Sequence, residues 1–326
     1  MKNKFALIGY TGFIGSNLLK FKKNIDKYNS KNISCIRNKD YEIVICAGTY
    51  SKRWWANKFP KKDKKNILLL TKNLEKVKTK KFILISTCEV YGESSRSKEN
   101  NKINIYGKSS YSKNRIFLEN FCKKNFHDLY IIRLPIVFGN NFSKNFIYDL
   151  LNKNNINKLN GKDSVQIYNV KNLLNDINFV LKKNIKLLNI SSPPIEIGFI
   201  SKKYFNIKLK KLSAYRKMNM KSLYSMNNSN YYISLRKTLK DLRLFLKKHN
   251  SKYKTIRDVK NFWNSKSIKL YSMQSILYKI NDAFIFGTLS QQKIFYKEVV
   301  KKIKLANSLN AKILVLGSPK NKKVFD

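Results

Sequence analysis

Three evenly spaced glycines near the start of the chain constrain its fold most. Gly9, Gly12 and Gly15 follow directly on the apolar run Phe5 to Ile8, and a helical pattern begins at Phe13 and extends to Phe21. A strand, a glycine turn and a helix in this order let the backbone approach a pyrophosphate, which is then bound at the helix N-terminus. The pattern therefore predicts a Rossmann unit that binds a dinucleotide.

Short apolar runs alternate with helical patterns over the first 135 residues. This alternation is typical of a parallel sheet built from βαβ units. We therefore expect an α/β fold with a doubly wound parallel sheet. Further strands are predicted at 43–47, 82–85 and 130–132, and helices at 66–78 and about 110–124.

The pattern loosens after Gly139, and Pro193-Pro194 breaks the chain. An amphipathic helix is predicted over 233–248, and a polar joint follows at 251–255. We divide the chain into a dinucleotide-binding Rossmann domain (1–139), a substrate-binding lobe (140–250), part of whose chain returns to the sheet, and a C-terminal fragment (251–326).

Lysine and arginine outnumber aspartate and glutamate by 68 to 19, which gives a net charge of +49. An excess of this size usually indicates nucleic acid or an anionic membrane as partner. Here the lysines are spread along the whole chain together with asparagine and isoleucine. We therefore interpret the charge as a diffuse, solvated surface and do not expect a nucleic-acid partner. The field should still attract dinucleotides and sugar nucleotides.

Cysteine and histidine content argues against several classes of site. The four cysteines form no Cys-x-x-Cys pair, and only two histidines are present, so we expect no metal site and no Ser-His-Asp triad. Free thiols in apolar surroundings are typical of a reducing cytoplasm. No apolar run approaches the roughly 20 residues of a membrane span. We therefore expect a cytoplasmic protein with no membrane partner, and leave a homodimer open.

The Gly-x-x-Gly-x-x-Gly spacing resembles that of the extended short-chain dehydrogenase/reductases, the NAD-dependent epimerase/dehydratase superfamily. Residues 86–92 (Ser-Thr-Cys-Glu-Val-Tyr-Gly) resemble its active-site strand end, and residues 133–139 (Arg-Leu-Pro-Ile-Val-Phe-Gly) resemble its strand leading to the substrate loop. The resemblance covers roughly residues 1–249 and implies a Rossmann fold with a small C-terminal substrate lobe. Four shorter segments resemble, more narrowly, a bacterial subgroup of oxidoreductases: 29–33, 46–48, 55–58 and 144–151.

The resemblance implies a tyrosine general acid/base, a lysine four residues later, and a Ser or Thr that hydrogen-bonds the reacting oxygen. Here Tyr111 takes the acid/base position, Arg115 stands where lysine is usual, and Thr87 takes the Ser/Thr position. Residues i and i+4 share a helix face, and a nearby cation favours the phenolate. Arginine keeps the charge but places it differently and cannot pass on a proton. If the chain is instead a relative that binds the dinucleotide without catalysis, Tyr111 would be a buried aromatic side chain with no role in proton transfer.

The segment Thr87-Cys88-Glu89 resembles the Thr-Asp-Glu of sugar-nucleotide 4,6-dehydratases, with Cys88 in place of their acid. Eliminating water from a sugar needs that proton donor, and a thiol at an apolar strand end is a poor substitute. We therefore expect an epimerase or a reductase rather than a dehydratase.

Separate groups of residues are predicted to hold the cofactor and the substrate. The predicted cofactor-binding residues are Gly9, Thr11, Gly12, Phe13, Ile14, Gly15, Asn29, Ser30, Lys31, Ala47, Gly48, Tyr111 and Arg115. The predicted substrate-binding residues are Thr87, Glu89, Asn140, Asn141, Lys144 and Asn145.

The end of the second strand bears on the choice between NADP and NAD. An NAD-specific site usually carries an acidic residue there, on the ribose 2′-hydroxyl. Residues 29–32 offer donors and a cation but no carboxylate, which favours NADP. Asp26 is close enough to keep NAD open.

The tail carries a second resemblance. Residues 272–277 (Ser-Met-Gln-Ser-Ile-Leu) and 316–321 (Leu-Gly-Ser-Pro-Lys-Asn) resemble early strand ends of a sugar-phosphate isomerase/epimerase TIM barrel. A complete barrel needs about 250 residues. We therefore interpret 251–326 as a truncated barrel fragment without activity of its own. Strands are predicted at 268–271 and 313–316, and a helix at 291–309.

These features together predict an NAD(P)-dependent epimerase or reductase that acts on a nucleotide-activated sugar in a polysaccharide or glycan pathway. Hydride would pass between nicotinamide and a sugar carbon while Tyr111 moves the hydroxyl proton. The alternative is a non-catalytic dinucleotide-binding protein that senses redox state or binds RNA. Arg115 in place of lysine and the positive charge motivate this alternative.

Overall fold

The computed structural model describes residues 4–19, 24–92, 96–225, 229–251, 256–277, 280 and 282–316. The end of the predicted first helix, most of the predicted joint at 251–255 and the predicted motif residues 317–321 lie outside these ranges. The chain divides into two compact units, Met1–Arg243 and Leu244–Asp326, and each is described by itself.

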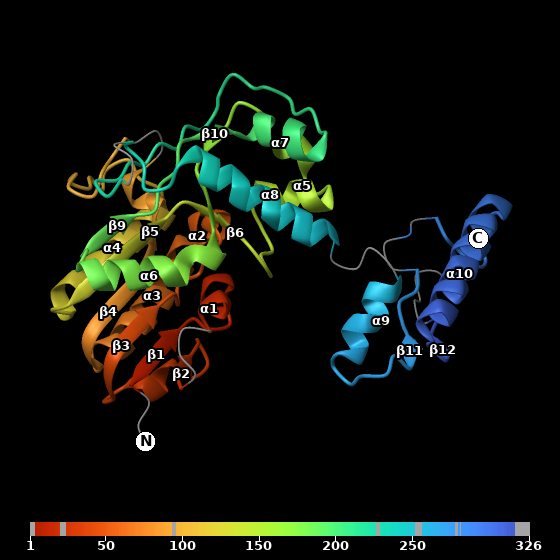
Figure 1. Ribbon diagram of the computed structural model, residues 1–326, viewed down its shortest axis with the longest axis horizontal. Helices are drawn as coiled ribbons and strands as arrows, with labels where there is room; N and C mark the ends of the chain where they lie inside the picture. The colour runs from red at the N-terminus through yellow and green to blue at the C-terminus, as the bar shows by residue number, and fades with distance from the viewer. Residues whose placement is uncertain are drawn as a thin grey trace. The chain divides into compact units, whose positions relative to one another are not determined.

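The first unit is built on a six-stranded parallel sheet with the strand order β2-β1-β3-β4-β5-β9 (Figure 1). The order reverses at β1, which lies between β2 and β3, as in a doubly wound fold. The predicted α/β class is therefore confirmed. The strands are β1 (Phe5–Ile8), β2 (Asp26–Tyr28), β3 (Asp40–Cys46), β4 (Lys78–Thr87), β5 (Leu129–Leu134) and β9 (Leu187–Asn189).

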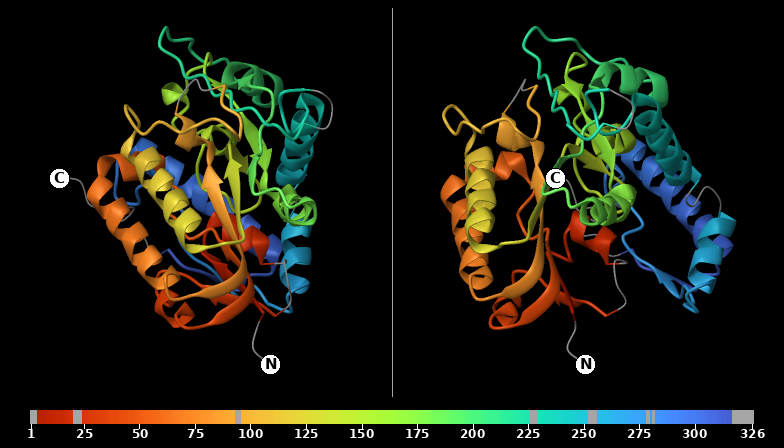
Figure 2. Two further views of the ribbon diagram at one scale, coloured as in Figure 1. Left: turned by 90° about the vertical axis from the view of Figure 1, so that its left-hand side faces the viewer. Right: turned by 60° about the vertical axis from the view of Figure 1, so that its left-hand side comes forward.

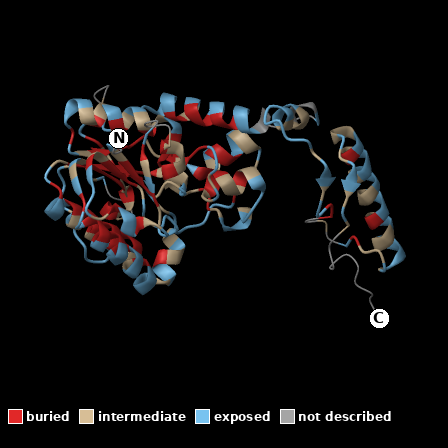
Figure 3. Cartoon of the chain, turned by 90° about the horizontal axis from the view of Figure 1, so that it is seen from below, coloured by how far each residue is buried: buried red, intermediate tan, exposed pale blue. Residues whose placement is uncertain are grey.

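Helices cover both faces of this sheet, as Figure 2 shows in its right-hand view. Successive strand residues point to opposite faces, so Ala6 and Ile8 pack in one core cluster while Leu7 packs in the other. Strands covered on both sides are rich in apolar residues, and many of the buried residues coloured in Figure 3 lie in them. One face is covered by α3 (Pro60–Leu74) and α4 (Ser110–Asn125), and the other by α1 (Phe13–Leu18) and α6 (Leu173–Lys183).

Local sequence determines where the two helices beside the site begin. Helix α3 begins at Pro60, which has no N–H to leave unpaired in a first turn. Helix α4 begins after Ser109, whose hydroxyl accepts a hydrogen bond from the Ser112 N–H at 3.3 Å. A short helix, α2 (Arg53–Lys58), leads into α3.

The remaining elements of the first unit lie after β5. Strand β6 (Ile136–Phe138) pairs in parallel with β8 (Ile167–Asn169), and β7 (Ser164–Val165) pairs antiparallel with β10 (Ile195–Glu196). Helices α5 (Phe146–Asn152) and α7 (Ile197–Phe205) belong to the same region. The boundary between the two units falls within α8 (Leu235–Ser251).

The second unit contains α9 (Ile256–Asn264), α10 (Leu289–Leu309), and a two-stranded parallel ladder of β11 (Ser272–Met273) and β12 (Ile313–Leu314). The ladder places its first strand just after the predicted range 268–271, because the pairing with β12 starts at Ser272. Its core is a small cluster around Ile276, Leu277, Ala283 and Phe295. No helix in the described part of the chain is long and apolar enough to cross a membrane.

Candidate functional site

The glycine turn lies between β1 and α1, and its shape requires two of its glycines. Gly9 has a φ of +84°, and a Cβ there would lie 2.4 Å from the carbonyl oxygen of Ala47. A Cβ on Gly15 would lie 2.1 Å from the carbonyl oxygen of Gly9. The Gly12 N–H donates to the Gly9 carbonyl at 2.9 Å, which closes the turn. The result is a turn with bare backbone at the carboxyl end of β1, where doubly wound folds bind nucleotides.

A cavity of about 500 Å³ lies beside this turn. No acidic residue is among the described residues that line it, and the one lysine there is Lys52. The lining residues are Ile8, Gly9, Thr11, Gly12, Asn29, Ser30, Ile33, Ala47, Gly48, Thr49, Tyr50, Ser51, Lys52, Asn66, Leu69 and Leu70. Seven predicted cofactor-binding residues line the cavity, while Phe13, Ile14, Gly15, Lys31, Tyr111 and Arg115 are not part of this lining.

The loop after β2 presents Asn29 and Ser30 to the cavity. The Asn29 carboxamide oxygen accepts a hydrogen bond from the Lys31 N–H at 2.9 Å, which shapes the loop. Asp26 is directed elsewhere, because its carboxylate accepts from the Tyr41 hydroxyl at 2.7 Å and lies 3.6 Å from the Lys39 ammonium. At the end of β2 the cavity is therefore lined by residues with amide and hydroxyl side chains and no carboxylate.

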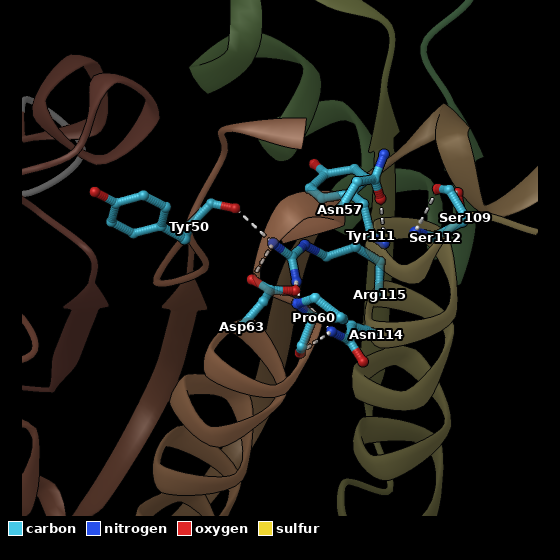
Figure 4. Close-up of polar contacts among 9 residues, drawn as sticks. All are labelled: Tyr50, Asn57, Pro60, Asp63, Ser109, Tyr111, Ser112, Asn114 and Arg115. Atoms are coloured by element: carbon cyan, nitrogen blue, oxygen red, sulfur yellow. Dashed lines mark hydrogen bonds and ion pairs between the residues drawn. The ribbon is translucent and has the colours of Figure 1, made fainter. Parts of the chain in front are cut away.

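Tyr111 lies in the first turn of α4 and is buried, with 8% of its surface exposed. Its N–H donates to the side-chain oxygen of Asn57 in α2 at 2.9 Å (Figure 4). The guanidinium carbon of Arg115 lies 4.4 Å from the centre of the Tyr111 ring. The two residues that the sequence places four apart therefore meet in the structure.

Arg115 is bound to two groups outside α4, as Figure 4 shows. Its Nη1 donates to Asp63 Oδ2 at 3.1 Å, and its Nη2 donates to Asp63 Oδ1 at 3.2 Å. Nη2 also donates to the carbonyl oxygen of Tyr50, which lines the cavity. Both partners of the ion pair are almost fully buried, with side chains 3% and 1% exposed. The guanidinium is thus held between α4, α3 and the cavity wall.

Asp63 and Asn57 were missed in the sequence. Asp63 is the one acid in the run Pro-Lys-Lys-Asp-Lys-Lys that opens α3, and an isolated acid in so basic a helix is the signal that could have identified it. It also accepts a hydrogen bond from the Asn114 side chain at 2.8 Å. Asn57 lies in the range 55–58 that resembles the bacterial oxidoreductase subgroup, but nothing in the sequence assigned it to the site.

Burial raises the pKa of Tyr111 above its ordinary value. The positive charge of Arg115 opposes this shift, while the nearby Glu89 adds to it. Burial is the larger effect, so the phenol is protonated at neutral pH in this structure. Burial of Cys88 likewise raises the pKa of its thiol, to about 12.

The end of β4 brings predicted substrate-binding groups close to α4. The Thr87 hydroxyl accepts a hydrogen bond from the Glu89 N–H at 3.3 Å, within the 3-10 turn η2 (Cys88–Tyr91). The Glu89 carboxylate forms ion pairs with Arg53 of α2, at 3.5 Å, and with Arg216. A carboxylate and two arginines therefore flank the strand end on which Thr87 lies.

A buried polar network fixes α4 against the sheet. Arg133 donates to both oxygens of Glu119, from Nε at 3.0 Å and from Nη2 at 2.5 Å. The Ser86 hydroxyl donates to the same carboxylate at 2.5 Å, and a third Arg133 nitrogen donates to the Tyr91 hydroxyl. These contacts connect α4, β4, η2 and β5, so they fix the helix that carries Tyr111 to the strand that carries Thr87.

The loop after Gly139 contains the other predicted substrate-binding residues. Lys144 donates to the carbonyl oxygen of Ser51 in the cavity wall. Asn145 caps α5, because its side-chain oxygen accepts from the N–H groups of Ile147 and Tyr148 at 2.9 and 3.2 Å. Asn140 and Asn141 are exposed. Of the four, Lys144 is the residue that the structure connects to the cavity.

Comparison with known proteins gives one family. A model of the NAD dependent epimerase/dehydratase family matches residues 6–180. No curated protein matches the chain. The match to the family model spans the sheet up to β5, the glycine turn and α4.

Solved structures resemble the chain at low sequence identity. A dTDP-4-dehydrorhamnose reductase from Clostridium acetobutylicum is 16% identical with a TM-score of 0.58, over 74% of this chain and 98% of that one. A UDP-glucuronic acid 4-epimerase from Bacillus cereus in complex with NAD is 18% identical with a TM-score of 0.55, over 77% and 97%. A dTDP-4-dehydrorhamnose reductase from Bacillus anthracis in complex with NADP is 18% identical with a TM-score of 0.51, over 75% and 93%. These structures share the fold, and the comparisons give no support to the barrel resemblance of 251–326.

Proposed function

Because the chain belongs to the NAD dependent epimerase/dehydratase family, we propose that it binds a nicotinamide dinucleotide and acts as an epimerase or reductase on a nucleotide-activated sugar. One observation carries this proposal. Tyr50 lines the cavity beside the glycine turn, its carbonyl oxygen accepts a hydrogen bond from Arg115, and the Arg115 guanidinium lies 4.4 Å from the ring centre of Tyr111. Similar structures were solved with NAD and with NADP.

The residues present fit such a cofactor. Gly9 and Gly15 let the turn pack closely on neighbouring backbone, and Gly12 lines the cavity without a side chain, as a turn that binds a diphosphate requires. Asn29 and Ser30 offer hydrogen-bonding groups without a negative charge where the ribose 2′ position is expected. We favour NADP over NAD for this reason, and the engagement of Asp26 with Tyr41 and Lys39 is consistent with it.

When bound, the nicotinamide would supply or accept a hydride. The chain's own residues would handle the proton and the oxygen. Tyr111 would exchange a proton with the reacting hydroxyl or carbonyl oxygen, and the Thr87 hydroxyl would hydrogen-bond that oxygen. Arg115 would act through charge alone, favouring the tyrosinate without donating a proton.

Cys88 supports an epimerase or reductase over a dehydratase. A thiol with a pKa of about 12 stays protonated at neutral pH and is a weak general acid. The elimination of water would need a stronger donor at this position. We also propose that the enzyme works in the cytoplasm, in a glycan or polysaccharide pathway.

A panel of dTDP- and UDP-linked sugars and 4-ketosugars, assayed with NADPH and NADH, tests the proposal. A substrate-dependent fall in absorbance at 340 nm identifies a reductase. Interconversion of two sugar nucleotides without net cofactor consumption, followed by chromatography, identifies an epimerase. The absence of both, with dinucleotide bound, would contradict the enzymatic proposal.

A second candidate is a non-catalytic dinucleotide-binding protein that senses redox state or binds RNA. The observation that favours it is the state of Tyr111, which is buried with a raised pKa beside an arginine engaged by Asp63. Salt-dependent RNA binding without turnover would support this candidate.

A further inference from the structure

Two lysines from different loops lie next to the same cavity-lining residue. Lys52 lines the cavity, and Lys144 donates a hydrogen bond from Nζ to the carbonyl oxygen of the preceding residue, Ser51. Lys144 comes from the loop after Gly139, 93 positions along the chain from Ser51. The contact therefore joins that loop to the cavity wall.

In the described part of the chain, no acid balances the charges of these two lysines. Arg115 also lies close by, but Asp63 neutralises it. Within the described ranges neither Lys52 nor Lys144 forms an ion pair, and no acid is present in the cavity lining. Lys144 is partly buried, and its pKa is lowered to about 8 by burial and by the charges of Lys52 and Arg115. Bringing two like charges together costs free energy that a shared anion would recover.

We propose that Lys52 and Lys144 bind a phosphate group of the ligand that occupies this cavity, and that Lys144 thereby holds the loop after Gly139 against that ligand. A phosphate oxygen is a stronger acceptor for an ammonium group than the Ser51 carbonyl. Lysine suits this role, because it presents a compact charge on a flexible stem. The identity of the ligand rests on the proposed function, and either the dinucleotide or the sugar nucleotide could supply the phosphate.

The Nη atoms of Arg115 are already engaged by protein groups, so this residue is not the cation expected to bind a phosphate. Both Nη atoms of Arg115 are occupied by Asp63 and one of them also by Tyr50. Lys52 and Lys144 are therefore the cations beside the cavity that no described acid neutralises.

Calorimetric titration of the full chain tests the proposal, with inorganic pyrophosphate, NADPH and UDP as separate probes. We compare the wild type with Lys144→Met, Lys144→Arg and Lys52→Met. Lys124→Met is the matched control, because Lys124 is exposed in the last turn of α4, at the opposite edge of the sheet. Losing one charged contact should weaken binding by about tenfold or more, with the arginine variant close to wild type and the control unchanged.

Proton uptake provides a second readout. At pH 8 Lys144 is partly deprotonated, so a phosphate that binds it should draw a proton from the buffer. The binding enthalpy of the wild type should then depend on the ionisation enthalpy of the buffer, and the number of protons taken up should be smaller in Lys144→Met and Lys144→Arg. The other charged groups facing Lys144 are Lys52, tested by its own variant, and the ion-paired Arg115.

The three probes separate the sources of the phosphate. If the lysine-to-methionine variants weaken the binding of NADPH but not of UDP, the phosphate belongs to the dinucleotide. If they weaken the binding of UDP but not of NADPH, it belongs to the sugar nucleotide. If the wild type does not bind pyrophosphate, or if Lys144→Met binds all three probes as the wild type does, the proposal is wrong. Failure of the proposed function has a different signature, because pyrophosphate would still bind through the lysines while no dinucleotide is turned over.

Discussion

Arg115 and Asp63 form a bidentate ion pair that is almost completely buried, with N–O distances of 3.1 and 3.2 Å. The pair joins the middle of α4 to the first turn of α3. It holds the guanidinium 4.4 Å from the ring centre of Tyr111. A substitution that removes the charge at position 115 or 63 therefore leaves the other residue as an unpaired buried charge.

Replacing Asp63 tests this coupling. Asp63→Asn leaves a buried arginine without a counter-charge, so we expect the free energy of unfolding to fall by about 3–5 kcal/mol, measured by urea denaturation. The matched control is Glu75→Gln, an exposed acid just after α3, which should change stability by less than about 0.5 kcal/mol. The double variant Asp63→Asn/Arg115→Met removes both charges and should recover part of the loss. A loss below about 1 kcal/mol in Asp63→Asn would contradict the importance of the pair.

Removing the Tyr111 hydroxyl tests the proposed acid/base. Tyr111→Phe should reduce turnover by at least about 100-fold, because positioned general acid/base groups contribute roughly 10²–10⁴. Cofactor affinity should stay nearly unchanged. Tyr106→Phe is the control, since Tyr106 is 85% exposed and lies shortly before α4 begins at Ser110. Undiminished turnover of Tyr111→Phe would show that another group moves the proton.

The charge of Arg115 should appear in the pH dependence of the reaction. Burial raises the pKa of Tyr111, and Arg115 opposes that shift, so Arg115→Met should raise this pKa further. A rate that depends on the tyrosinate would then reach its plateau at higher pH than in the wild type. Arg115→Lys keeps the charge and should retain measurable activity with an intermediate profile. The control is Lys113→Met, which removes an exposed charge from the same helix, and an unshifted profile for Arg115→Met would contradict an electrostatic role.

The end of β2 should determine cofactor preference. We expect tighter binding of NADPH than of NADH, because Asn29 and Ser30 present no carboxylate to the cavity. Ser30→Asp should weaken NADPH binding by about tenfold or more, through repulsion of the 2′-phosphate, and spare NADH. Lys31→Met, which changes an exposed side chain outside the cavity lining, is the comparison. Titration of both cofactors measures this, and a clear NADH preference of the wild type would refute the argument.

The fold could be predicted from the sequence because its signals are local. The glycine turn, the apolar strands and the helical spacing of Ile67, Leu70 and Leu74 each lie within a few residues of one another. The candidate site could be predicted only in part. Tyr111 and Arg115 share one helix, but Asp63 lies 52 positions from Arg115 and no spacing rule connects them.

The lysine pair shows the same limit. Lys144 and Ser51 are 93 positions apart, and 68 basic residues hide any one lysine from composition arguments. Lys31 was chosen for its position after β2, yet the structure leaves its side chain outside the cavity lining. In the tail, β11 pairs with β12 from Ser272 onward, whereas the apolar pattern predicted the strand at 268–271.

Titration of NADPH into the wild type and into Gly12→Asp tests the central claim most directly. A Cβ at Gly12 would meet only the Gly9 carbonyl oxygen, at 3.3 Å, a tight contact that a shift of a few tenths of an ångström relieves, so we expect the turn to form with a carboxylate beside the cavity. We predict that the wild type binds NADPH and that Gly12→Asp, with an unchanged thermal melt, binds it at least about 100-fold more weakly, as expected for a negative charge placed beside a diphosphate. No binding by the wild type, or equal binding by Gly12→Asp, would show that this cavity is not a dinucleotide site.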